Sequence, residues 1–253
     1  MSQRPLLTAE EAKRAIYLDL EGRAGQSPVL LGALWVSRQG QEPMFRQYVL
    51  DGAFASAALA TGRSATSFAG ELKSLMTRAQ SQDRVMVGWS EYEVRMVAEF
   101  APEFSGEFDL RYRDARALAR HWRKKIHPGY KVSSNNGAKK HSLGYYMALA
   151  DHAPPAEFWG GWVAKTIAEV RDSLEHRGSY DALSAKQQTR WNDLLGYNEH
   201  DCRATRAVCF VALDELAKPE LSTARSKKGA RARKENTKEH GKKHGKKLAG
   251  RVA

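Results

Sequence analysis

The spacing of apolar residues predicts an α/β protein that begins with a group of strands. Residues 15–21 are largely apolar and end at Gly22, a pattern typical of a buried strand followed by a turn. Two more apolar runs lie at 29–36 and 44–50, and their short connections favour antiparallel pairing. The first fifty residues therefore predict a three-stranded meander.

After the meander, strands and helices are expected to alternate. Strands are predicted at 85–89 and 107–113, which brings the number of strands to five. Such an order is typical of a mixed sheet flanked by helices. Helical spacing of apolar residues is found at 67–80, 91–100, 115–125, 142–149, 164–175 and 185–217, the last with a possible break near Gly196.

The positive charge of the chain is concentrated near its C-terminus. The formal net charge is +12, and residues 218–253 hold thirteen Lys or Arg against three Glu. This segment has few large apolar residues and cannot bury enough surface to fold. We expect a lead-in at 1–14, one domain at 15–217 and a disordered basic tail at 218–253. The tail either binds a polyanion or only keeps the chain soluble.

Composition also bears on the compartment. Cys202 and Cys209 are seven residues apart on one predicted helix, which is too far for a disulfide, so both are expected to be reduced. No apolar run approaches the roughly 18 to 20 residues of a membrane span. The polar start of the chain has no apolar signal core, so we expect a cytoplasmic protein without a membrane partner.

Candidate chemistry begins at the end of the first predicted strand. Asp19 and Glu21 are two residues apart and project on the same side of a strand. Two neighbouring carboxylates repel each other and resist burial unless a cation neutralises them. Carboxylate oxygens suit Mg²⁺ or Mn²⁺. The alternative is an ordinary strand end, with one carboxylate in water and the other capping a turn.

A second candidate lies on the last predicted helix. Tyr197 and Asp201 are four residues apart and share a helix face, which Ala204 and Val208 continue as an apolar stripe. A hydroxyl and a carboxylate are therefore expected to point together at the sheet. The alternative is a helix with an exposed aspartate.

Taken together, Asp19-Leu20-Glu21 and Tyr197-x-x-x-Asp201 resemble the DEDDy branch of the ribonuclease H-like 3′–5′ exonucleases. The string YNEHDCRAT is most similar to the small predicted nucleases of the YprB or RecB type. The resemblance covers residues 15–213. It implies a five-stranded mixed sheet, with three antiparallel strands followed by two parallel ones and with the D-x-E strand central.

The middle motif of that family departs from its usual form here. The family has an aromatic residue followed by Asp, and Tyr92-Glu93 stands at that position. Trp89 also stands where many members have Asn. Glu93 is either a longer replacement for the family aspartate or an ordinary exposed helix residue.

The resemblance implies a two-metal phosphodiester hydrolysis on single-stranded ends, with two Mg²⁺ or Mn²⁺ ions. Asp19 would bridge both ions, and Glu21 and Asp201 would complete the site of the ion that activates water. Glu93 would hold the second ion. Tyr197 would orient the attacking water and assist its deprotonation. The catalytic set is therefore Asp19, Glu21, Glu93, Tyr197 and Asp201.

Basic residues near the predicted helix 115–125 are candidates for binding single-stranded DNA or RNA, with Tyr112 and Trp122 as stacking partners. The alternative is a solvated helix face. The rival functions are a catalytically silent nucleic-acid-binding module, an endonuclease on the same fold and a protein-interaction scaffold. The candidate nucleic-acid contacts are Arg116, Arg120, Arg123, Lys124, Lys131, Lys139 and Lys140.

Overall fold

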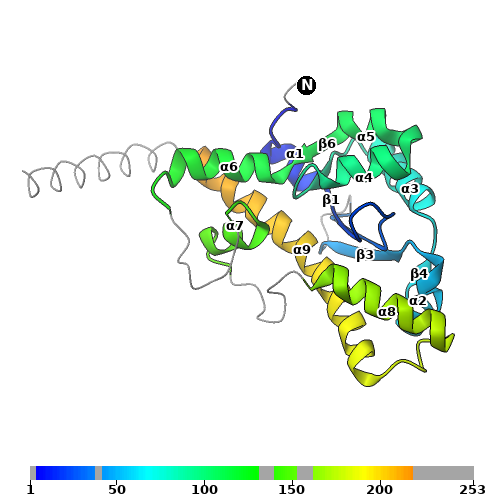
Figure 1. The fold of residues 1–253 in the computed structure, drawn as a ribbon. Coiled ribbons are helices and arrows are strands. Elements are labelled where there is room, and N and C mark those ends of the chain that lie inside the picture. The colour runs from blue at the N-terminus through cyan, green and yellow to red at the C-terminus, as the bar shows by residue number, and fades with distance from the viewer. Residues whose placement is uncertain (1–3, 38–41, 131–139, 153–161, 219–253) are drawn as a thin grey trace, which may run out of the picture.

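The computed structural model describes residues 4–37, 42–130, 140–152 and 162–218. Within these ranges a six-stranded mixed sheet has helices on both faces (Figure 1). The strand order is β4-β3-β2-β1-β5-β6, which places β1 inside the sheet. The strands are β1 (Ile16–Glu21), β2 (Leu30–Trp35), β3 (Met44–Val49), β4 (Ser64–Ala65), β5 (Met86–Gly88) and β6 (Tyr112–Asp114).

The pairing of the strands agrees with the predicted α/β class. β1, β2 and β3 form an antiparallel meander, and β5 and β6 continue the sheet in parallel with β1. The expectation of five strands was wrong, because β4 adds a sixth strand in parallel with β3. Its two residues are exposed and are too few to show an apolar period.

The predicted strand at 107–113 was wrong over most of its length. Residues Ser105–Arg111 form α5, and only Tyr112–Asp114 pair in the sheet. The spacing of Phe104 and Phe108 is helical. Phe108 is 1% exposed, and its ring stacks on Tyr112 with centroids 5.4 Å apart. The buried face of a helix thus explains apolar residues that were interpreted as a strand.

The long helix α9 passes through Gly196 without a break. A glycine inside a helix costs about 1 kcal/mol relative to alanine, and burial of the neighbouring Leu195 and Asn198 offsets this cost. α8 packs along the first part of α9, and α6 and α7 pack along its later part (Figure 1). The helices are α1 (Ala9–Arg14), α2 (Ala55–Ala60), α3 (Phe68–Ser81), α4 (Tyr92–Phe100), α5 (Ser105–Arg111), α6 (Ala115–Ile126), α7 (Leu143–Leu149), α8 (Val163–Arg177) and α9 (Ala185–Ala217).

Side chains alternate along β1, so one face of the strand is apolar and the other, here called the mixed face, carries Tyr17 and two acidic residues. Ile16, Leu18 and Leu20 pack against α3 and α4 in one core cluster. Tyr17 belongs to the cluster on the opposite face, formed largely by α6, α7 and α9. Because side chains two residues apart share a face, Asp19 and Glu21 lie on the α9 side of the sheet.

The lead-in contributes to the core. Thr8 and Glu11 form a capping box at the start of α1, and Leu7 and Ala12 are at most 2% exposed. The Tyr17 hydroxyl donates to the Ala12 carbonyl at 2.9 Å. The segment before β1 is therefore anchored to the mixed face of the sheet.

Candidate metal centre

Three carboxylates from two distant parts of the chain meet beside the sheet. Asp19 and Glu21 come from β1, and Asp201 comes from α9. One oxygen atom from each of the three residues lies within 4.8 Å of the other two. The structure thus brings together the D-x-E pair and the final aspartate that the sequence singled out.

Tyr197 lies one helical turn before Asp201, and the two side chains are hydrogen-bonded. Burial, followed by the charge of Asp201, raises the pKa of the Tyr197 hydroxyl. A phenol with a raised pKa keeps its proton and donates to the carboxylate, which favours an orienting role; assistance with the deprotonation of water stays a prediction. The Trp162 ring packs edge-on against Tyr197, with centroids 5.7 Å apart.

The carboxyl groups of the cluster are poorly suited to ionise together. Burial and then the charge of Asp201 raise the pKa of Asp19 to about 7. Burial also raises the pKa of Asp201 to about 7, against the opposing effect of the Tyr197 hydrogen bond. The pKa of Glu21 is raised well above its ordinary value, first by burial and then by the charges of Asp19 and Asp201. A divalent cation bound among these groups would stabilise their ionised forms and so lower their pKa values.

The donor set fits a hard divalent cation. All three side chains offer carboxylate oxygens, the ligands that Mg²⁺ and Mn²⁺ prefer over the nitrogen and sulfur ligands of zinc. Among the described residues, no lysine or arginine forms an ion pair with Asp19, Glu21 or Asp201. Asp19, Glu21 and Asp201 are therefore the residues that would hold a metal ion.

Glu93 is placed differently from the other three acidic residues. It is only 3% exposed, so it is not the exposed helix residue of the alternative interpretation, but it lies outside the group of three carboxylates. Its Oε2 accepts a hydrogen bond from the Tyr112 hydroxyl at 2.8 Å. Burial raises the pKa of Glu93 to about 8. Glu93 and Tyr112 thus form a buried polar pair next to the cluster.

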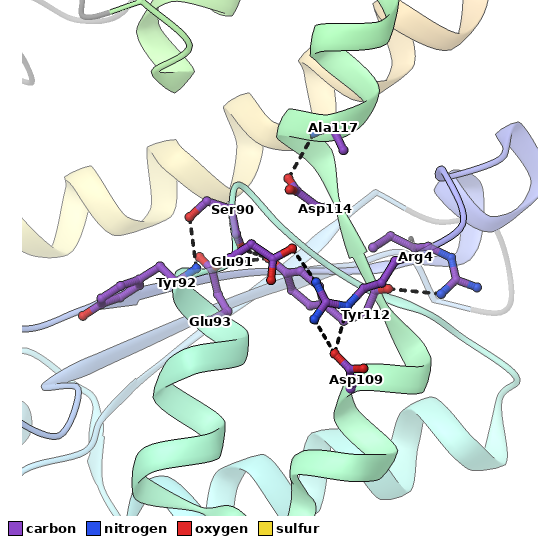
Figure 2. Close-up of polar contacts among 10 residues, drawn as sticks. Arg4, Ser90, Glu91, Tyr92, Glu93, Asp109, Tyr112, Asp114 and Ala117 are labelled. Atoms are coloured by element: carbon purple, nitrogen blue, oxygen red, sulfur yellow. Dashed lines mark hydrogen bonds and ion pairs between the residues drawn. The ribbon is translucent and has the colours of Figure 1, made fainter. Parts of the chain in front are cut away.

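The surroundings of this pair are fixed by the N-terminal segment (Figure 2). Arg4 donates to Glu91, before α4, and to Asp109 of α5. Its guanidinium also lies 5.7 Å from the centroid of the Tyr112 ring. The Ser90 carbonyl also faces the Tyr112 hydroxyl, whose single proton is shared between this carbonyl and Glu93. Arg4 therefore connects the lead-in to the two segments that carry Glu93 and its partner.

Exchanging Gly88 for alanine is expected to destabilise the fold by about 1–3 kcal/mol, the usual result of overpacking. An added Cβ would lie 2.4 Å from the Tyr112 hydroxyl and 2.7 Å from Glu93 Cδ. The matched control is Gly106→Ala, where a helical Cβ meets nothing within 4 Å and helix propensity favours alanine. Chemical denaturation of both variants measures the difference. Equal stability of the two variants would contradict the close packing of Gly88 against Tyr112 and Glu93.

Two residues of the site were not assigned to it from the sequence. Asn198 is fully buried and donates to Asp19, and Tyr112 donates to Glu93. Asn198 stands within the motif between Tyr197 and Asp201, and its weak signal was a small polar residue on an inward helix face. Tyr112 was interpreted as a stacking partner for bases, but it is fully buried.

The predicted nucleic-acid contacts are brought together in part. Arg116, Arg120 and Arg123 lie on α6, and their charges, together with that of Lys140, add to burial in lowering the pKa of His141. We call Arg116, Arg120, Arg123, Lys140 and His141 the α6–α7 basic cluster. Lys124 is exposed on α6 but is not part of it. Lys131, Lys139 and the tail lie outside the described residues, and Trp122 is fully buried.

Comparisons with family models, curated proteins and solved structures find no match to this chain. Both cysteines are free, as the sequence predicted, and both are buried. Within the described ranges, no helix combines the length and the apolar character needed to span a bilayer.

Proposed function

We propose that this protein is a metal-dependent nuclease that removes nucleotides from the 3′ ends of single-stranded nucleic acid. The observation that carries the proposal is the Asp19, Glu21 and Asp201 cluster, whose oxygens lie within 4.8 Å of one another beside a hydrogen-bonded tyrosine. Hydrolysis of an end-labelled strand that requires Mg²⁺ or Mn²⁺ tests it.

The side chains divide the work between holding charge and fixing orientation. Asp19, Glu21 and Asp201 would hold the metal ion. Glu93 is close enough to interact electrostatically with Asp19. When bound, the divalent cations stabilise charge on the attacking and leaving oxygens of the phosphodiester. Tyr197 keeps its proton and holds Asp201 in place through their hydrogen bond. Its ring packs edge-on against the Trp162 ring.

The α6–α7 basic cluster supports a nucleic-acid substrate. Its charges lie near one another over the buried tyrosine rings of α7. The His141 and Tyr146 rings stack with centroids 5.9 Å apart, and Tyr146 contacts Trp89 at 5.6 Å. Trp89 directly follows β5 and lies four residues before Glu93. Because Tyr145 and Tyr146 are buried, the positive charges of the cluster, and not these rings, would contact the phosphates of a single strand.

Replacing Arg116, Arg120 and Lys140 together with alanine is expected to weaken single-strand binding and to reduce its salt dependence. Each lost phosphate contact lowers the slope of log K against log salt by about 0.7 for a single strand. Titrations of a labelled oligonucleotide at several salt concentrations measure this slope. The control replaces three exposed lysines on other helices, Lys73, Lys165 and Lys186. A slope change as large in the control would reject the basic cluster as the binding surface.

A catalytically silent nucleic-acid-binding module is the second candidate. The specific observation in its favour is Glu93, which replaces the family aspartate and is bonded to Tyr112 outside the carboxylate group. Tight binding of a single strand without cleavage in Mg²⁺ or Mn²⁺ would identify this module. Cleavage of a circular single strand would instead identify an endonuclease, because a circle has no end from which an exonuclease can start.

A further inference from the structure

A row of in-register residues crosses three strands of the sheet beside Asp19. Asp19 of β1 pairs with Gly32 of β2, and Gly32 pairs with Gln47 of β3. The middle position has no side chain, so the row contains a notch between a carboxylate and an amide. A Cβ at Gly32 would lie 2.6 Å from Asn198 Oδ1, which shows that the Asn198 side chain of α9 fills this notch.

Asn198 connects the two ends of the row. Its Nδ2 donates to Asp19 Oδ2 at 2.7 Å and to the Asp19 carbonyl at 3.0 Å. Its Oδ1 accepts from Gln47 Nε2 at 2.7 Å. Gln47 Nε2 also donates to the Leu195 carbonyl at 3.0 Å, and Gln47 Oε1 accepts from Arg63 Nε at 2.7 Å. The amide groups of Asn198 and Gln47 are thus fully engaged.

The direction of this chain of hydrogen bonds is fixed at both ends. The Arg63 guanidinium can only donate, and an ionised Asp19 can only accept. Turning over either amide would place two acceptors or two donors against each other. Every donor in the series therefore points from Arg63 toward Asp19. The orientation of the Asp19 carboxylate thus depends on Asn198 of α9, on Gln47 of β3 and on Arg63, which precedes β4.

We infer that Asn198 and Gln47 are positioning residues that fix the Asp19 carboxylate in the orientation needed to bind a divalent cation, with Arg63 as the outer end of the series. This inference rests on the proposed metal centre. Residues that orient metal ligands in this way typically change metal affinity or activity by about 10- to 100-fold when mutated. Arg63 lies in an open groove of about 630 Å³ between β3, β4 and α9, so the outer end of the series is at the surface.

Gln47→Glu is the sharpest test, because it keeps the shape of the side chain and replaces one donor by an acceptor. The new oxygen would face Asn198 Oδ1 and the Leu195 carbonyl, so Asn198 must lose a bond or turn its oxygen toward Asp19. Gln47 is only partly buried, which favours folding of the variant. Gln188→Glu is the matched control, since Gln188 Nε2 likewise donates to two carbonyl oxygens, both of them in the main chain and far from the cluster.

Isothermal titration with Mn²⁺ is the primary measurement. The Kd of Gln47→Glu is expected to rise about 10- to 100-fold, whereas Gln188→Glu stays within about twofold of wild type. Gln47→Glu should also have a lowered kcat, which recovers at high Mn²⁺, and an unchanged KM for the oligonucleotide. A general loss of folding would not recover at high Mn²⁺.

An unchanged Mn²⁺ affinity in Gln47→Glu, or an equal loss in Gln188→Glu, would overturn the inference. A wild-type protein that binds no Mn²⁺ would overturn it together with the metal centre. A wild-type protein that binds Mn²⁺ but cleaves no nucleic acid would reject the nuclease proposal and still allow the affinities of the variants to decide the role of Gln47.

Discussion

Replacing Asp19 with asparagine is expected to lower the rate of phosphodiester hydrolysis by about 10³-fold or more. A catalytic metal ion supplies several kcal/mol of transition-state stabilisation, and each 1.36 kcal/mol corresponds to a tenfold change in rate. An amide in this place carries no charge for the cation but still accepts the hydrogen bond from Asn198. The variant should therefore fold normally and bind the oligonucleotide.

The matched control for this substitution is Asp193→Asn. Asp193 lies on α9, which also carries Asp201, but it is not part of the carboxylate cluster. Single-turnover rates in Mn²⁺ for wild type and both variants measure the effect. Asp19→Asn activity within tenfold of wild type would show that hydrolysis does not depend on this cluster.

The second large effect is expected in the pH dependence of stability without metal. The folded-state pKa values of Asp19 and Asp201 are about 7 and that of Glu93 is about 8, whereas unfolded Asp and Glu titrate near 4. The folded state therefore holds more protons between these values, and stability falls as pH rises from about 4 to about 8. Below pH 4 these groups are protonated in both the folded and the unfolded state, so they no longer lower the stability.

Melting temperatures in EDTA and in Mn²⁺ at pH 5 and pH 8 measure this effect. Mn²⁺ at 100 times its Kd adds about 2.7 kcal/mol, which raises the melting temperature of a domain of this size by roughly 5–10 °C. At one fixed Mn²⁺ concentration the increase in melting temperature should be larger at pH 8 than at pH 5, because the carboxyl groups must lose their protons to bind the cation. In EDTA at pH 8, Asp201→Asn should melt above wild type, whereas Asp193→Asn should not. A metal-free protein that becomes more stable toward pH 8 would contradict the raised pKa values.

The sequence predicted those parts of the fold whose signals are local. The helices predicted at 115–125 and 142–149 are present, and local caps begin them: Asp114 accepts from the Ala117 amide and Ser142 from the Tyr145 amide. The antiparallel meander followed from three apolar runs with short connections. β4 and α5 were not predicted, because β4 has only two residues and the apolar period of α5 is short.

The site was predictable to the extent that its residues stand in short motifs. Asp19, Glu21, Tyr197 and Asp201 share faces that follow from the periods of strand and helix. The partner of Glu93 and the partners of Asp19 depend on tertiary contacts across 19 to 179 residues of chain. No local pattern encodes such contacts, so Tyr112, Asn198 and Gln47 became visible only in the folded structure.

The most direct test of a nuclease function follows the fate of 5′-labelled single-stranded DNA and RNA oligonucleotides in Mg²⁺, Mn²⁺ or EDTA. The predicted result is a ladder that shortens from the 3′ end with either metal, is absent in EDTA and is absent in Asp201→Asn. The label also shows whether DNA or RNA is preferred. An undiminished ladder in EDTA or in Asp201→Asn, or no cleavage with either metal, would contradict a hydrolytic metal centre at Asp19, Glu21 and Asp201.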